Sequence, residues 1–287
     1  MSQTDIYLKS AVAAAKKFAP IFKKYFGCPK TVSIKHGDPH DLVTEIDRRI
    51  ETGIRKYILQ KFPTHKIIGE EFGASALGKN DIVWIIDPID GTTNYIQGLP
   101  FACISIGLWD AKGPLVGVVY NPILKELYTA QRDKGSFLNG KKLQVSKISK
   151  FGTAYGGFGW GRDITIAIKS FPVVISNTKK IRTLGSSTLE ICLIARGVYD
   201  FLIQKRINVW DYAAAVLILT EAGGKTTDTK GQNLNLQSTS ILGTNGKIHK
   251  ESDFDVAYLS TKDLTFDDEV DINFQFTNIF RNDRVDT

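Results

Sequence analysis

The chain has 287 residues, of which 43% are hydrophobic and 23% are charged, which is ordinary for a soluble globular protein with a sizeable core. No apolar run approaches the roughly 20 residues that span a bilayer, and the N-terminus lacks the basic-then-apolar layout of a signal peptide. Three dispersed cysteines form neither a disulfide framework nor a metal-binding spacing. We therefore expect a reduced, cytoplasmic location and no membrane partner.

The formal net charge of +7 is unevenly distributed along the chain. Residues 251–287 contain ten acidic and three basic residues, so this segment carries −7 and the preceding 250 residues carry +14. We treat 251–287 as an acidic C-terminal extension of a body spanning 1–250. A basic body attracts polyanions, nucleic acid included, but the chain has no Arg-rich block and no aromatic–basic ladder for single strands.

Helices and a short strand are predicted first along the chain. Apolar residues at helical spacing among lysines predict a helix over 4–27, which Pro20 should kink or divide. A second apolar stripe predicts a helix over 45–61. The segment Lys66–Gly69 then predicts a short strand that leads into Glu70.

Strands dominate the next stretch. The run from Ile82 to Ile86 is apolar and β-branched, which indicates a buried strand. We expect this strand to stop at Pro88, because proline cannot donate to a sheet ladder. Alternating or apolar runs predict further strands and one hairpin, at 103–109, 115–120, 126–130 and 137–140.

Helices and strands alternate in the second half of the body. The pattern predicts a glycine-rich loop, two helices and three strands, in the order 157–162, 172–176, 187–196, 199–203, 211–222 and 240–243. In the tail, residues 270–276 alternate at period two, which is typical of a half-buried strand. The whole sequence therefore predicts an α/β fold of stacked sheets and helices, with merged subdomains over about 1–145 and 146–250.

The segment Asp87-Pro-Ile-Asp-Gly-Thr-Thr-Asn94 is the strongest chemical signal. It places two carboxylates three residues apart where the chain turns at a strand end, followed by Gly91 and Thr92. Small residues of this kind bring backbone amides close to a phosphate. Singly, Asp90 fits a turn former and Asp211 a helix N-cap.

Together, Glu70, Asp87, Asp90 and Asp211 leave many acids beside apolar segments. Carboxylates at the rim of a core repel one another and lose hydration, and a divalent cation relieves both costs. Oxygen ligands suit Mg²⁺ or Mn²⁺, and the chain has no His/Cys cluster that would indicate zinc.

Several short blocks follow one another along the chain: Asp41–Asp47, Gly69–Glu71, Trp84–Asn94, Gly185–Ser186, Trp210–Ala215 and Glu221–Gly224. In this order and spacing they resemble the inositol monophosphatase family of Mg²⁺-dependent, lithium-sensitive sugar-phosphate phosphatases. The resemblance covers about residues 5–250 and implies a layered αβαβα sandwich and often a homodimer.

The resemblance also implies roles for individual residues. Two or three Mg²⁺ ions would be held by Glu70, Asp87, Asp90, Asp211 and the Ile89 carbonyl. Asp47 would hydrogen-bond the Thr92 hydroxyl and, with Glu70, orient a water for in-line attack on phosphorus. Substrate contacts would come from Asp90, Gly91, Thr92, Gly185, Ser186, Ser187, Gln204 and Asp211.

Two positions bear on substrate choice. Many inositol-cleaving relatives have Glu where this chain has Gln204, and glutamine keeps an acceptor oxygen but loses the charge. Arg162, in the glycine-rich loop, fits either a solvated loop arginine or a contact with the second phosphate of a substrate such as fructose 1,6-bisphosphate. We expect a phosphomonoesterase for a small polyol or sugar phosphate, with inositol 1-phosphate as the default. Fructose 1,6-bisphosphate, histidinol phosphate and 3′-phosphoadenosine phosphates stay open, as does a regulatory role with RNA.

Overall fold

The structure is a computed structural model. It describes residues 2–29, 31–34, 42–74, 76–78, 80–159, 161 and 164–249. The tail strand predicted at 270–276, the phosphate contact predicted for Arg162, and Asp41 lie outside these residues.

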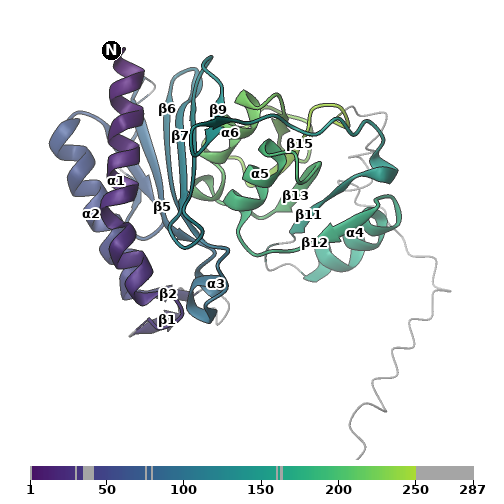
Figure 1. Cartoon of the computed structure of the whole chain (residues 1–287), viewed down its shortest axis with the longest axis horizontal. Coiled ribbons are helices and arrows are strands. Elements are labelled where there is room, and N and C mark those ends of the chain that lie inside the picture. The colour runs from purple at the N-terminus through teal and green to yellow at the C-terminus, as the bar shows by residue number, and fades with distance from the viewer. Residues whose placement is uncertain are drawn as a thin grey trace, which may run out of the picture.

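Helices and sheets alternate in layers across the molecule (Figure 1). The helices are α1 (Gln3–Tyr25), α2 (Glu45–Lys61), α3 (Thr92–Gln97), α4 (Ile164–Ser176), α5 (Ser187–Ala195) and α6 (Ala215–Glu221), with 3-10 turns η1 (Phe151–Thr153) and η2 (Val209–Asp211). A small two-stranded sheet pairs β1 (Val32–Ile34) with β2 (Leu42–Thr44).

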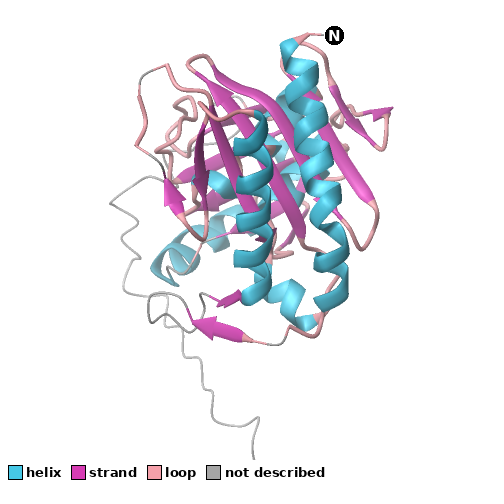
Figure 2. Cartoon of the chain, turned by 90° about the vertical axis from the view of Figure 1, so that its left-hand side faces the viewer, coloured by secondary structure: helices cyan, strands magenta, loops and turns pink. Residues whose placement is uncertain are grey.

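The first large sheet has the strand order β10-β9-β8-β7-β6-β5-β3-β4. Its strands are β3 (Lys66–Gly69), β4 (Gly73–Ala74), β5 (Val83–Asp90), β6 (Cys103–Asp110), β7 (Gly113–Asn121), β8 (Glu126–Gln131), β9 (Ser136–Leu138) and β10 (Lys141–Lys142). All of its pairs are antiparallel except β3 with β5. The long helices α1 and α2 lie across one face of this sheet (Figure 2).

The second sheet has the order β12-β11-β13-β15-β14. Its strands are β11 (Tyr155–Gly159), β12 (Lys180–Arg182), β13 (Phe201–Lys205), β14 (Lys225–Thr227) and β15 (Ser240–Thr244). Strand β11 pairs in parallel with both β12 and β13, and the pairs of β15 are antiparallel.

Alternation along β5 divides the core into two compartments. Trp84 and Ile86 pack with the apolar sides of α1 and α2, whereas Val83 and Ile85 pack with α5 and α6. Each fully buried apolar side chain stabilises the fold by about 1.5–3 kcal/mol. The sheet is therefore covered on both faces, as a continuous apolar run in a strand predicts.

A third apolar cluster lies on the far side of the second sheet. Phe158 and Phe201 from the sheet pack there with Phe171 and Val174 of α4. The layers are thus α1–α2, the first sheet, α5–α6, the second sheet, and α4. The predicted αβαβα sandwich is confirmed. Among the described residues, no helix combines the length and apolar character needed to cross a bilayer.

Two predictions about prolines need correction: the division of the first helix at Pro20 and the end of the strand at Pro88. Helix α1 runs through Pro20 without being divided; Pro20 and Lys16 are exposed there, so water can satisfy the carbonyl that the proline leaves without a donor. Strand β5 does not stop at Pro88 but continues to Asp90. The pairing with β6 shifts between Asp87 and Asp90, so the proline occupies an irregularity of the ladder, where no donor is needed.

Three predictions in the second half also differ from the structure. The strand predicted at 172–176 is the end of helix α4, because a short apolar run does not distinguish a strand from one buried side of a helix. The loop predicted at 157–162 begins inside strand β11, whose glycines lie between two neighbouring strands. Helix α6 begins at Ala215, later than the predicted 211, because η2 and a turn precede it.

Candidate active site

Three acids from two separate segments meet at the end of β5. Asp87 and Asp90 come from the irregular end of that strand, and Asp211 comes from η2. Each contributes a carboxylate oxygen, and these oxygens lie within 4.8 Å of one another. The fold thus brings Asp90 and Asp211 together although they are far apart in the sequence, as the predicted set of metal ligands requires.

Close backbone packing brings Asp211 to this position. The Trp109 indole Nε1 donates to the Ala213 carbonyl at 2.9 Å. At Gly117 on β7, a Cβ atom would lie 2.3 Å from the Ala214 carbonyl oxygen, so only glycine admits this approach. The Asp211 carboxylate also accepts from the Asn208 amide at 2.9 Å, which closes η2.

Glu70 follows β3 and lies beside the same cluster. Its amide donates to the Ile86 carbonyl at 3.3 Å, immediately before Asp87. The Glu70 carboxyl group shares a hydrogen bond with Asp87, and its charge raises the Asp87 pKa. All four predicted acidic ligands therefore converge.

Protein donors hold two of these carboxylates in place. Asp87 Oδ1 accepts from the Ile89 amide at 2.9 Å. Asp90 Oδ2 accepts from the Thr188 amide at 3.0 Å and from the Ser186 hydroxyl. The N-terminal turn of α5 thus orients Asp90 across the boundary between the two sheets.

Burial makes these acids resist ionisation. Loss of hydration raises the pKa of Asp87 well above its usual range, and the charges of Glu70, Asp90 and Asp211 raise it further. Burial also raises the pKa of Asp90 to about 6, although hydrogen bonds from Ser186 and Thr188 oppose the shift. A divalent cation favours the charged forms, and an all-oxygen donor set fits Mg²⁺ or Mn²⁺.

Asp47 and Thr92 are not joined by the predicted hydrogen bond. The Thr92 hydroxyl donates to the Ile89 carbonyl at 3.0 Å. Asp47 Oδ2 accepts from the Thr44 amide and hydroxyl at 2.9 and 2.6 Å, whereas the buried Oδ1 has no hydrogen-bond partner. Burial, with a smaller contribution from the charges of Glu70 and Glu71, raises the Asp47 pKa to about 7, although the hydrogen bonds from Thr44 oppose the shift. Asp47 Oδ1 is an acceptor without a donor.

Gly91 forms the turn that follows the acids. It precedes α3 with φ = 86°, and α3 starts at Thr92, so the helix start expected at this position is confirmed. A Cβ on Gly91 would lie 2.9 Å from the Phe101 carbonyl oxygen and 3.3 Å from that of Gly185. The Gly185 segment therefore packs directly on this turn, and Asn94 Nδ2 ties the two together by donating to the Leu184 carbonyl at 2.7 Å.

The predicted substrate residues have different surroundings. Ser186 is buried, and its hydroxyl donates to Asp90, whereas Ser187 is half-buried and Gly185 is exposed. Gln204 lies on β13 with its side chain against Gly159, where a Cβ would be 1.5 Å from Gln204 Oε1.

Thr188 belongs to the site although the sequence did not identify it. Its hydroxyl donates to the Asp211 carbonyl at 2.7 Å, while its amide donates to Asp90. One residue thus links two of the predicted metal ligands. A hydroxyl residue in the first turn of a helix was the available signal, but helix starts commonly have one for capping alone.

Comparison with known proteins agrees with this geometry. The chain matches the Inositol monophosphatase family over residues 4–258. It is 40% identical over 252 residues to inositol monophosphatase 2 of Solanum lycopersicum, covering 84% of this chain and 94% of the relative. It is 35% identical to the fructose-1,6-bisphosphatase/inositol-1-monophosphatase of Aquifex aeolicus, covering 78% and 86% of the two chains.

A solved structure shares the fold. The IMPase of Thermotoga maritima superposes with a TM-score of 0.79 at 34% identity, covering 90% of this chain and 97% of the other. Fold and site therefore define a metal-dependent phosphatase of phosphate monoesters. The chain belongs to the inositol monophosphatase family.

Proposed function

We propose that this protein is a Mg²⁺-dependent phosphomonoesterase that hydrolyses a small polyol phosphate, with inositol 1-phosphate as the principal substrate. The convergence of Asp87, Asp90 and Asp211 within 4.8 Å carries this proposal. Three buried or half-buried acids this close have a strong requirement for a cation, and the adjoining Gly91 turn offers a place for the phosphate.

The metal ligands in this proposal are carboxylates and one carbonyl. Glu70, Asp87, Asp90, Asp211 and the Ile89 carbonyl would hold two or three Mg²⁺ ions, replaceable by Mn²⁺. Bound divalent ions lower the pKa of a water and neutralise charge on phosphate and leaving oxygens.

The remaining residues orient the reactants. The Gly91 and Thr92 amides donate to phosphate oxygens at the start of α3. Asp47 Oδ1, which is buried without a donor, accepts a hydrogen bond from the attacking water once the site is filled. Glu70 is close enough to Asp47 for its charge to raise the Asp47 pKa. It accepts the other hydrogen of the same water, so that the water attacks phosphorus opposite the leaving oxygen.

The polyol is recognised beyond the phosphate. Gly185 and Ser187 offer an exposed and a half-buried contact beside the Gly91 turn. Asp90 and Asp211 accept from a hydroxyl of the substrate. Ser186 acts chiefly through Asp90, and Gln204 contributes a neutral acceptor that disfavours a cationic substrate such as histidinol phosphate.

A substrate panel at fixed Mg²⁺ tests the proposal. Inositol 1-phosphate, fructose 1,6-bisphosphate, histidinol phosphate and 3′-phosphoadenosine 5′-phosphate are compared by phosphate release, with Asp90→Asn as the control for contaminating activity. We expect inositol 1-phosphate to give the highest kcat/KM. Fructose 1,6-bisphosphate is the second candidate, since the Aquifex aeolicus relative has both activities in its name. Release no faster than in Asp90→Asn for every substrate contradicts the proposal.

A second function follows from charge. The body carries +14 before residue 251, and such a charge supports an RNA-associated regulatory role. RNA affinity that falls steeply with added salt would support that role. We further infer that the protein is a homodimer and is located in the cytoplasm. Sizing of the full chain and of a truncation after residue 250 tests the oligomeric state.

A further inference from the structure

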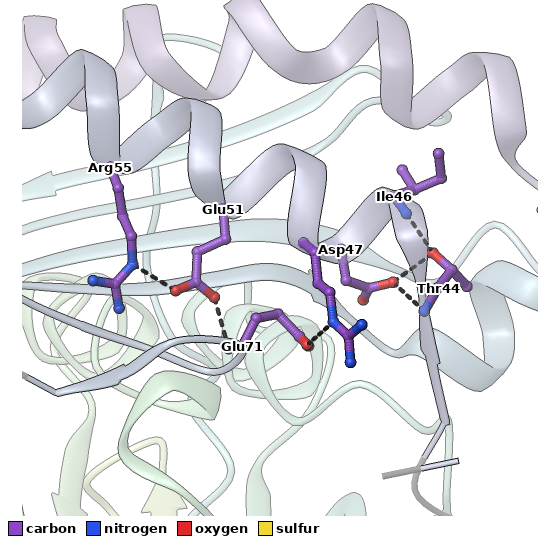
Figure 3. A network of polar contacts seen from close by, with 7 residues as sticks. Thr44, Ile46, Asp47, Glu51, Arg55 and Glu71 are labelled. Atoms are coloured by element: carbon purple, nitrogen blue, oxygen red, sulfur yellow. Dashed lines mark hydrogen bonds and ion pairs between the residues drawn. The ribbon is translucent and has the colours of Figure 1, made fainter. Parts of the chain in front are cut away.

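One side of helix α2 carries three charged residues at four-residue spacing. Asp47, Glu51 and Arg55 therefore project toward the same edge of the first sheet (Figure 3). Asp47 has a place in the proposed site, but the function described so far assigns nothing to Glu51 or Arg55. Glu51 is completely buried, which is unusual for a carboxylate and calls for a compensating partner.

Both carboxylate oxygens of Glu51 contact the segment around Glu70 or the arginine beside it. Its Oε2 accepts from the Glu71 amide at 2.8 Å. Its Oε1 accepts from Arg55 Nε at 2.7 Å and lies where a Cβ of Gly69 would be only 2.0 Å away. The carboxylate thus rests against the main chain on both sides of Glu70, at residues 69 and 71.

Arg55 secures the other end of the same turn. Its Nη2 donates to the Gly73 carbonyl at 2.7 Å, and its guanidinium lies 5.7 Å from the centre of the Phe72 ring. The main chain from Gly69 to Gly73 is therefore fixed to α2 at three points. In Figure 3 the dashed contacts run from Arg55 through Glu51 to Glu71.

A buried ion pair of this kind is a poor way to gain stability alone, since loss of hydration offsets most of the attraction. Its geometric effect is specific, because a charged acceptor fixes the amide that follows Glu70. A carboxylate that must reach an ion within a few tenths of an ångström depends on such support from the residues around it.

We propose that Glu51, held by Arg55, is a positioning residue that sets the direction of the Glu70 carboxylate toward the divalent ion. This inference rests on the proposed function, in which Glu70 is a ligand. It adds Glu51 and Arg55 of α2 to the site as residues that contact neither substrate nor metal.

Glu51→Gln tests the inference by metal binding, read independently of turnover. An amide keeps one acceptor but turns a donor toward either the Glu71 amide or Arg55, so one of the two bonds is lost. We expect the Kd for Mn²⁺, measured from free Mn²⁺ by electron paramagnetic resonance, to rise about tenfold. The Mg²⁺ concentration for half-maximal activity should rise by the same factor, with kcat at saturating Mg²⁺ within about threefold of wild type.

Asp110→Asn is a matched control. Asp110 also accepts from an arginine and a backbone amide, Arg132 Nη2 and Lys112 N, both at 2.8 Å. It lies at the opposite end of β6 from Cys103, which pairs with Asp90, and this separates it from the site by about 20 Å. We expect its Mn²⁺ Kd to equal that of wild type.

The outcomes separate the two proposals. A folded Glu51→Gln protein that binds Mn²⁺ as wild type does overturns the positioning role but leaves the phosphatase intact. A wild-type protein that neither binds Mn²⁺ nor releases phosphate overturns the proposed function itself. If Glu51→Gln does not fold, Arg55→Lys decides: lysine cannot reach both Glu51 and Gly73, so an unchanged Kd in this variant refutes the inference and a Kd raised about threefold supports it.

Discussion

Asp47→Asn should stabilise the metal-free protein at alkaline pH while impairing catalysis. The substitution fits the site because Asp47 Oδ2 already accepts two bonds from Thr44, whereas Oδ1 is buried without a partner. An asparagine keeps the first oxygen and removes the charge that burial penalises. It also removes the acceptor that the proposed mechanism needs.

The magnitude follows from the pKa of Asp47, which burial raises from 3.8 to about 7. Below about pH 4 Asp47 is protonated in both the folded and the unfolded protein, so it costs no stability. As the pH rises from there to about 7, the unfolded chain loses this proton more readily than the folded protein, and the free energy of unfolding falls. The full difference corresponds to about 4 kcal/mol, of which about 3 kcal/mol develops between pH 5 and pH 8.

Urea unfolding in EDTA at pH 5 and pH 8 measures this effect. We expect the free energy of unfolding of Asp47→Asn, relative to wild type, to increase by about 3 kcal/mol between the two pH values. Added Mg²⁺ should reduce the advantage of the variant, because cations stabilise the ionised wild-type site. A variant that gains no stability at pH 8 would refute the claim that the buried charge of Asp47 destabilises the metal-free protein.

Four other substitutions probe the same site. Asp87→Asn and Asp211→Asn should each abolish turnover and weaken Mg²⁺ binding in calorimetry, because each removes a charged ligand; turnover near the wild-type rate contradicts the metal assignment. Thr188→Val keeps the amide bond to Asp90 but loses the hydroxyl bond to the Asp211 carbonyl, so the Mg²⁺ requirement should rise about fivefold, and an unchanged requirement argues against this link. Gly91→Ala places a residue at φ = 86° and should cost about 1–3 kcal/mol of stability, measured by thermal unfolding together with lower kcat; an unchanged melting temperature would contradict the crowding at this turn.

Periodicity was sufficient to predict most of the fold. The helices over 4–27, 45–61 and 187–196 appear at nearly the predicted positions, because amphipathic stripes and caps are local signals. The failures occurred where long-range packing decides. Three of the five residues of strand β11 are glycines, which become regular only through pairing with neighbouring strands, and α4 has an apolar run that equally suits a strand.

The acids of the site could be predicted from the sequence, but the groups that hydrogen-bond to them could not. Glu70, Asp87, Asp90 and Asp211 stand out as carboxylates beside apolar segments. Which groups orient them could not be predicted, because the donors come from distant parts of the chain, such as Thr188 for Asp90. The predicted bond from Thr92 to Asp47 is also absent, since the Thr92 hydroxyl donates to the Ile89 carbonyl instead.

A crystal structure of the full chain soaked with Mn²⁺, with anomalous scattering recorded, tests the central claim most directly. We predict two anomalous peaks about 3.5–4 Å apart, each within about 2.3 Å of oxygens from Glu70, Asp87, Asp90 or Asp211. Peaks held by other residues, or none at this cluster at saturating Mn²⁺, would contradict a metal-dependent phosphatase at the end of β5.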